Sequence, residues 1–213
     1  MTKKSVVIDY GIGNVFSVMQ ALKRNDCDAR LTNDSQEILN ADRVILPGVG
    51  AFGRAAEKLR TMGLDDVIHS YIEQERPFMG ICVGMQLLME KGMEFGEHAG
   101  LGLFKGTVEK IDAKDSSGAA LPVPVIGWNS LEKPSDARWN NTALSGVPDD
   151  AAFYFVHSYS ARPSDTKDIC ATAPVGDTDV VAAIQRDNIL GVQFHPERSA
   201  DHGIGMISTF LNS

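Results

Sequence analysis

The sequence predicts an α/β fold in which a mostly parallel central sheet is flanked by helices and carries added antiparallel strands. Two observations favour this fold class. Short apolar runs alternate with amphipathic helical segments as far as about residue 90, which is the pattern of a doubly wound parallel sheet. From Gly106 onward, short strands and turns predominate. No linker, repeat or low-complexity segment interrupts the chain, so we expect one domain over residues 1–213.

Apolar runs and helical spacing place the elements of the first half. The expected strands cover residues 5–10, 28–32, 44–46 and 78–81. The expected helices cover residues 15–24, 34–40, 52–61 and 64–74, with Asp34 as a candidate N-cap of the second. The Gly11–Gly13 turn lacks the third glycine of a dinucleotide-binding fingerprint, because Phe16 stands at that position.

The second half is predicted to be mostly β-structure. Strands are expected at residues 107–111, 123–126, 153–156, 180–185 and 189–194, the last two joined by a hairpin turn at 186–188. Polar loops are expected at 112–120 and 133–151, with an aromatic turn at 127–129. A helix from about His202 to Leu211 ends the chain.

The composition excludes several classes of partner. Hydrophobic residues make up 43% and charged residues 23%, the mix of a globular protein in water. The net charge is −8 without a Lys/Arg cluster, so we expect neither nucleic acid nor a membrane as partner. No apolar run reaches the roughly 18 residues of a membrane span, and no signal segment precedes the first strand. Three widely spaced cysteines form no CxxC pair, so a reducing cytoplasm is the expected location.

The segment PFMGICVGMQLLM, residues 77–89, predicts a buried strand, a tight turn that carries Cys82, and an amphipathic helix. Gly80 and Gly84 flank the cysteine, and glycine lets a backbone turn sharply while leaving the sulfur uncrowded. A cysteine at a helix start also meets unpaired N–H groups and the positive end of the helix dipole, which favour a thiolate. A buried structural cysteine is the alternative, but glycines on both sides favour a nucleophile.

A second glycine-rich segment, Pro47–Gly50 (PGVG), follows the expected strand at 44–46. Such a segment can direct backbone N–H groups toward the carboxyl edge of a parallel sheet, where they would stabilise a developing oxyanion. Taken alone, it is better explained as a plain strand-to-helix loop.

A cysteine nucleophile needs a base, and the base needs an orienting group. His195 is the best candidate, because it follows a buried strand and precedes Pro-Glu. In an extended segment, residues 195 and 197 project the same way, so Glu197 would accept a hydrogen bond from the imidazole. Cys82, His195 and Glu197 would then form an acyl-transfer triad that works through a thioester.

His157 is the competing base, since it also ends a strand, or it lines the pocket with Ser158 and Tyr159. His, Cys and carboxylate residues show no metal-ligand spacing, and no phosphate-binding GxxxxGK[ST] loop is present. No metal or cofactor is therefore expected.

Two motifs, GICVGMQ at 80–86 and VQFHPE at 192–197, resemble the signature of class I (triad) glutamine amidotransferases. Four further segments resemble, within that family, the glutaminase subunits of imidazole glycerol phosphate synthases. They are DYGIGN at 9–14, PGVGAF at 47–52, GWN at 127–129 and FVHSY at 155–159. The similarity extends from residue 6 to about residue 212.

The resemblance implies hydrolysis of L-glutamine to glutamate and ammonia, with Cys82 as nucleophile, His195 as general base and Glu197 as its orienting group. It implies an oxyanion strand at Gly48, Val49 and Gly50, with the Val83 N–H as a second donor. The residues implied to hold the amino-acid end of glutamine are Gln86, Glu94, His157, Ser158 and Tyr159.

The resemblance also implies a heterodimer. Ammonia would pass, shielded from water, to a (β/α)₈-barrel cyclase subunit that makes imidazole glycerol phosphate and AICAR in histidine biosynthesis. The residues implied to face that partner are Gly11, Asn14, Trp128 and Asn129.

One position departs from the family pattern: Val125 stands where a histidine usually precedes the GWN segment by two residues. This position bears on the acceptor of the ammonia and not on the glutaminase, so one alternative is a paralogous glutaminase that supplies ammonia for sugar amidination. Two further alternatives do not depend on Val125. One is a catalytically silent regulatory subunit, which the intact Cys82, His195 and Glu197 disfavour. The other is a related cysteine peptidase or deglycase, which Gln86, Glu94 and residues 157–159 disfavour because they suit a free amino acid.

Overall fold

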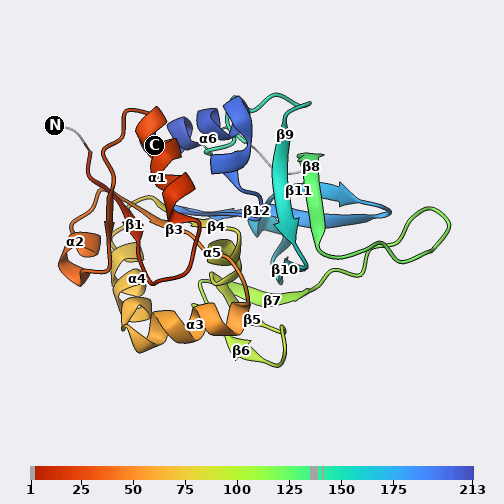
Figure 1. Ribbon diagram of the computed structural model, residues 1–213, viewed down its shortest axis with the longest axis horizontal. Coiled ribbons are helices and arrows are strands. Elements are labelled where there is room, and N and C mark those ends of the chain that lie inside the picture. Colours follow the sequence, from red (N-terminus) through yellow and green to blue (C-terminus); the bar gives the residue numbers. More distant parts are fainter. Residues whose placement is uncertain (1–2, 135–138, 141) are drawn as a thin grey trace.

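A seven-stranded sheet forms the centre of the part of the chain that the computed structural model describes, residues 3–134, 139–140 and 142–213 (Figure 1). The strand order is β11-β12-β13-β4-β3-β1-β2. The strands are β1 (Ser5–Ile8), β2 (Arg30–Thr32), β3 (Arg43–Leu46), β4 (Phe78–Ile81), β11 (Ile169–Val175), β12 (Thr178–Arg186) and β13 (Ile189–Val192). The run from β13 to β2 is parallel, whereas β11, β12 and β13 pair antiparallel. The predicted fold class is confirmed.

Helices cover both faces of this sheet, so its central strands are buried throughout and consist of apolar runs. α1 (Val15–Arg24) and α6 (Ala200–Asn212) lie on one face, and α2 (Ser35–Leu39), α3 (Phe52–Thr61) and α4 (Leu64–Ile72) lie on the other (Figure 1). Asp34 caps α2 by accepting the Glu37 N–H at 2.9 Å, as predicted. None of the helices among the described residues is long and apolar enough to cross a bilayer.

Two smaller sheets follow from the second half of the described chain. One has the order β10-β7-β5-β6 and comprises β5 (Met89–Gly92), β6 (His98–Ala99), β7 (Phe104–Lys110) and β10 (Tyr159–Pro163). The other is a two-stranded antiparallel ribbon of β8 (Val125–Ser130) and β9 (Ala152–His157), which projects beside the main sheet (Figure 1). Three short helical turns complete the fold: α5 (Val83–Gln86), η1 (Thr166–Asp168) and η2 (Pro196–Arg198).

Two local predictions differ from the structure, and a third lies partly outside the described residues. The segment at 127–129 is not a turn but part of β8, because each of its residues pairs with one in β9. The helix after Cys82 ends at Gln86 instead of continuing to Met89, which begins β5. Of the loop predicted at 133–151, residues 135–138 and 141 lie outside the described residues. The hairpin turn between β12 and β13 is confirmed.

Candidate active site

Cys82 occupies a sharp bend between β4 and α5. Its backbone has φ 54° and ψ −111°, in the left-handed half of conformational space that non-glycine residues rarely adopt. The Cys82 N–H donates to the Val192 carbonyl at 2.8 Å, which ties the bend to β13. A Cβ at Gly84 would lie 2.0 Å from the Leu46 carbonyl oxygen, and one at Gly80 would lie 2.6 Å from the Gly84 oxygen. The bend therefore requires glycine on both sides of the cysteine.

The sheet order brings three sequence motifs to one edge. β13, β4 and β3 are parallel neighbours, so the residues that follow them emerge side by side at the carboxyl edge. Cys82 follows the middle strand, His195 follows β13, and Pro47–Gly50 follows β3. The PGVG segment also packs under the bend, since a Cβ at Gly48 would lie 2.5 Å from the Gly84 nitrogen.

The loop after β3 is held in place from its other side. The buried Tyr10 hydroxyl donates to the Pro47 carbonyl at 2.9 Å. Gly50 has φ 83°, which glycine adopts without strain. Val83 is the first residue of α5, so its N–H has no acceptor within the helix and is free to point at a ligand.

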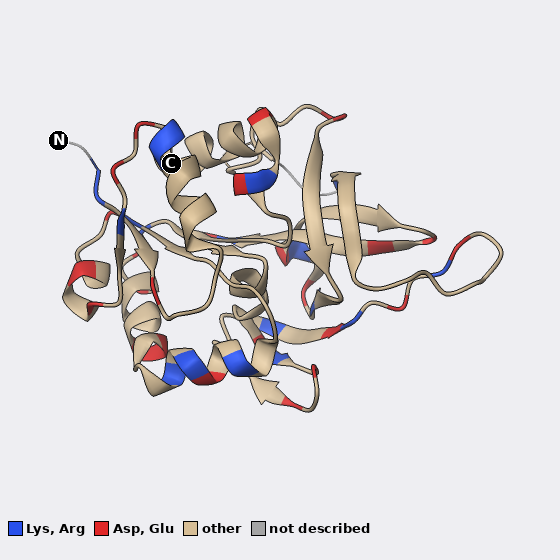
Figure 2. Cartoon of the chain, in the orientation of Figure 1, with Lys and Arg blue, Asp and Glu red and all other residues tan. Residues whose placement is uncertain are grey.

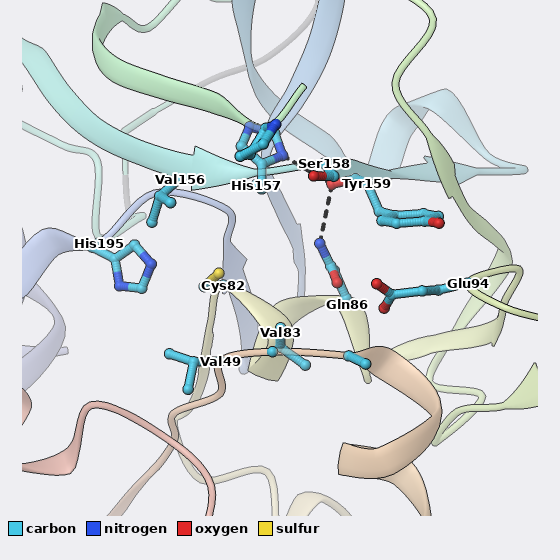
Figure 3. A pocket seen from close by; sticks show the side chains of 13 residues that line it. Val49, Cys82, Val83, Gln86, Glu94, Val156, His157, Ser158, Tyr159 and His195 are labelled. Carbon is cyan, nitrogen blue, oxygen red and sulfur yellow. Dashed lines mark hydrogen bonds between the residues drawn. The ribbon is translucent and has the colours of Figure 1, made fainter. Parts of the chain in front are cut away.

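A cavity of about 390 Å³ opens where these segments meet. In Figure 3, Cys82 lies between His195 on one side and Gln86 and Glu94 on the other, with His157 and Tyr159 across the cavity. Its lining includes ten of the predicted site residues: Val49, Gly50, Cys82, Val83, Gln86, Glu94, His157, Ser158, Tyr159 and His195. Residues from distant parts of the sequence therefore form one site.

His195 and Glu197 form a buried pair. The imidazole Nδ1 lies 2.8 Å from Oε1 of Glu197, and the two side chains are 4% and 1% exposed. Burial alone would lower the pKa of His195, but the proximity of Cys82 and Glu197 outweighs burial and raises the pKa to about 10. The imidazole is therefore held in its charged form beside the sulfur at neutral pH.

The backbone conformation that brings His195 and Glu197 together differs from the one predicted from the sequence. Residues 196–198 form the short helix η2, not an extended segment, and Glu197 lies within it. The contact therefore arises from a helical turn that follows His195, and not from the two-residue alternation of a strand.

His157 differs from His195 in its partner. Its Nδ1 lies 2.8 Å from the Tyr159 carbonyl oxygen, which can only accept, so this nitrogen carries the proton. Burial lowers the pKa of His157 to about 4, so the ring is neutral at pH 7. Val125, on the neighbouring strand, pairs directly opposite His157 in the β8–β9 ribbon.

Polar groups gather at the opposite end of the cavity. Gln86 donates from Nε2 to the Tyr159 carbonyl at 3.1 Å and to Oε1 of Gln193 at 2.9 Å. Glu94 accepts the Phe52 N–H at 2.7 Å and turns toward Gln86 (Figure 3). An acidic group beside an amide oxygen suits an ammonium group. Sequence reasoning missed Gln193, although it lies in the VQFH segment that drew attention to His195.

The residues expected to face a partner do not line the cavity. Gly11 and Trp128 are exposed, while Asn14 and Asn129 are half-buried. Trp128 is 52% exposed and meets Tyr154 edge-on, with the ring centroids 5.9 Å apart. These positions therefore belong to the rim or the outer face of the described fold.

Comparison with known proteins identifies the family of these motifs. The family model of class-I glutamine amidotransferases matches residues 6–212. Imidazole glycerol phosphate synthase subunit HisH 1 of Legionella pneumophila strain Lens is 39% identical over 206 residues, covering 96% of this chain and 97% of the relative. Subunit HisH of Rhodospirillum rubrum is 42% identical over 215 residues, covering 96% of each chain.

Solved structures share the fold at lower sequence identity. PurLQS from Thermotoga maritima superposes with a TM-score of 0.72 at 21% identity, covering 100% of this chain and 99% of the other. A glutamine amidotransferase from Thermotoga maritima gives a TM-score of 0.63 at 15% identity, covering 100% of this chain and 97% of the other. Both likenesses bear on the fold alone.

Proposed function

Because the chain belongs to the class-I glutamine amidotransferase family, we propose that it hydrolyses L-glutamine to glutamate and ammonia as the glutaminase subunit of an imidazole glycerol phosphate synthase. The observation that carries this proposal is the position of Cys82. It lies between a charged histidine–glutamate pair and a group of acceptors that suits an amino acid's ammonium. Relatives about 40% identical over nearly the whole chain bear the name of that synthase subunit.

The arrangement supports the following sequence of steps. The Cys82 sulfur attacks the carboxamide carbon of glutamine, and the oxygen of the resulting tetrahedral intermediate becomes negatively charged. N–H groups of Val83 and of the Gly48–Gly50 segment stabilise that oxygen. His195 gives its proton to the leaving nitrogen, so ammonia departs and a thioester remains.

Water then completes the turnover. His195, now neutral, accepts a proton from water as it attacks the thioester carbon, and the sulfur leaves as a thiolate. Glu197 holds the imidazole by its Nδ1–H and stabilises the imidazolium, which is present before the first half-reaction and forms again in the second. Glutamate leaves, and the protein returns to its starting charge state.

The amino-acid end of glutamine lies away from His195 in this proposal. Glu94 and Oε1 of Gln86 accept from the ammonium group, and residues 157–159 close the opposite wall. The neutral state of His157 avoids placing a second positive charge beside that ammonium.

A barrel-shaped cyclase is the proposed partner. β8 and β9 carry no charged residue (Figure 2). Ile126 and Trp128 on β8 expose large apolar side chains. Apolar and aromatic surface with few charges is typical of the core of a protein interface. Phe16, at the start of α1, is 72% exposed and is a further exposed aromatic side chain. With Gly11, Asn14 and Asn129, these residues would meet the partner.

The test is glutamate release by the purified chain, alone and with a cognate (β/α)₈-barrel cyclase plus its ribonucleotide ligand. We expect turnover that rises with the ligand-loaded partner and is abolished by Cys82→Ala. Cys27→Ala and Cys170→Ala are matched controls, because neither cysteine lines the cavity. Turnover that the ribonucleotide never stimulates would assign the ammonia to another acceptor, such as a sugar. Absence of turnover with every partner would overturn the proposal.

A further inference from the structure

Gln193 is a fully buried polar residue to which the proposed reaction assigns no role. Its exposed fraction is 0%, and it follows the last residue of β13. Val192 pairs with Ile81 in the parallel register, so the next residue on each strand, Gln193 and Cys82, also lie side by side. The Gln193 backbone N–H donates to the Ala182 carbonyl at 2.8 Å, which fixes the start of its side chain.

The side chain of Gln193 lies between Gln86 and Cys82, two residues that line the cavity. Its Oε1 accepts from Nε2 of Gln86 at 2.9 Å, and its Nε2 lies 3.7 Å from the Cys82 sulfur. Gln86 in turn donates to the Tyr159 carbonyl at 3.1 Å. A continuous chain of hydrogen bonds therefore runs from a backbone carbonyl to the nucleophile.

The backbone carbonyl determines the direction of every bond in this chain. The Tyr159 oxygen can only accept, so Gln86 must turn its NH₂ group toward it. The same NH₂ group faces Gln193, so Gln193 must present its oxygen there and turn its own NH₂ group to the sulfur. A hydrogen-bond donor therefore faces Cys82, and a donor stabilises a thiolate more than a thiol.

The same logic orients Gln86. Both N–H directions of its amide are occupied, by Tyr159 and by Gln193, which leaves Oε1 as the atom that can meet a ligand. An acceptor at this point, next to Glu94, is what an ammonium group requires. Gln193 supplies one of the two acceptors that hold the amide in this orientation, and the Tyr159 carbonyl supplies the other, so loss of Gln193 would leave the amide less firmly oriented.

We propose that Gln193 is a positioning residue that donates a hydrogen bond to the Cys82 sulfur and, together with the Tyr159 carbonyl, holds Gln86 so that its oxygen is the acceptor for the amino group of the substrate. This role rests on the proposed glutaminase reaction. The buried amide of Gln193 would thus stabilise the thiolate form of Cys82 and also help to keep a hydrogen-bond acceptor at the end of the cavity that binds the amino group. Gln193 acts through Cys82 and Gln86 and need not touch glutamine itself.

The test uses two variants of the full chain. Gln193→Met keeps the length of the side chain and removes both hydrogen bonds, whereas Gln193→Glu keeps the shape and replaces the donor by an acceptor. The first readout is the rate of Cys82 alkylation by iodoacetamide as a function of pH, measured by mass spectrometry of the Cys82 peptide. This readout needs no glutamine turnover. The other titratable groups that act on Cys82, His195 and Tyr10, are unchanged.

We expect Gln193→Met to slow the alkylation about tenfold near neutral pH, as expected for one lost hydrogen bond to a charged group. Gln193→Glu should slow it further, because a carboxylate would face the thiolate. Gln185→Met is the matched control: it makes the same change on β12, near the opposite end of β13, and should alkylate like the wild type.

The second readout is the steady-state kinetics of glutamine hydrolysis, which separates a positioning role from a merely structural one. Loss of the sulfur contact lowers kcat, and loss of the Gln86 orientation raises KM for glutamine, so Gln193→Met should change both in a protein with a wild-type unfolding midpoint. Wild-type alkylation profiles in both variants would overturn the inference. If the wild type turns over no glutamine but the Gln193 variants still shift the alkylation profile, only the proposed function fails.

Discussion

His157 makes the free energy of unfolding depend on pH in the acidic range. Burial lowers its pKa from 6.5 to about 4, so between these values the unfolded chain binds a proton that the folded chain does not. Folding is therefore progressively disfavoured as the pH falls through this window, and the penalty is absent above it. A pKa difference of one between the folded and unfolded chains corresponds to about 1.4 kcal/mol, so the free energy of unfolding falls by about 2–3 kcal/mol at about pH 4.5.

The assay is urea unfolding of the wild type and of His157→Gln at about pH 7.5 and about pH 4.5. Glutamine can donate to the Tyr159 carbonyl in place of the imidazole but does not titrate. On acidification the free energy of unfolding of the wild type should fall by about 2–3 kcal/mol more than that of the variant. Any constant effect of the substitution cancels, because the comparison is between two pH-dependent changes. Equal losses would refute the claim that burial keeps this ring neutral.

Three further predictions concern the bend, the triad and a distant ion pair. Gly84→Ala places a Cβ 2.0 Å from the Leu46 oxygen and should destabilise the protein by more than about 2 kcal/mol in urea. Its control, Gly205→Ala at an uncrowded position on α6, should stabilise the protein by about 0.5–1 kcal/mol. Glu197→Gln should lower kcat for glutamine hydrolysis about 10²–10⁴-fold with little change in KM, and a wild-type kcat would remove Glu197 from its proposed role. Asp168→Asn weakens the ion pair with Arg186, whose side chain is 42% exposed. The free energy of unfolding in urea should therefore fall by about 1–2 kcal/mol, and an unchanged value would contradict the pairing.

The parts of the site that the sequence predicted are those with local signatures. Gly80 and Gly84 indicate a bend because no other residue fits the contacts that the bend makes. The order of apolar runs indicates a parallel sheet, and a parallel sheet places successive strand ends at one edge. Cys82 and the PGVG segment could therefore be assigned to one edge from the sequence, whereas the place of His195 at that edge depends on the parallel pairing of β13 with β4.

The parts that sequence reasoning missed depend on pairing between distant segments. Gln193 contacts Cys82 only because β13 is in register with β4, and nothing within either segment specifies that register. The 127–129 segment contains glycine and asparagine, which favour turns, yet pairing with β9 makes it a strand. The His195–Glu197 contact was expected from an extended backbone but is made by a helical turn, so a correct contact followed from the wrong local geometry.

Glu94 connects the cavity to a helix through a single carboxylate. One of its oxygens accepts the Phe52 N–H at 2.7 Å, at the positive end of α3, while the side chain also faces the cavity. Under the proposed function, an arriving ammonium would draw charge away from that hydrogen bond. The amide proton of Phe52 is therefore a built-in reporter of occupancy, and its chemical shift and exchange rate should follow the binding of glutamine. A Cys82→Ala protein, in which no substrate is consumed, would let NMR spectroscopy count filled sites without any added label.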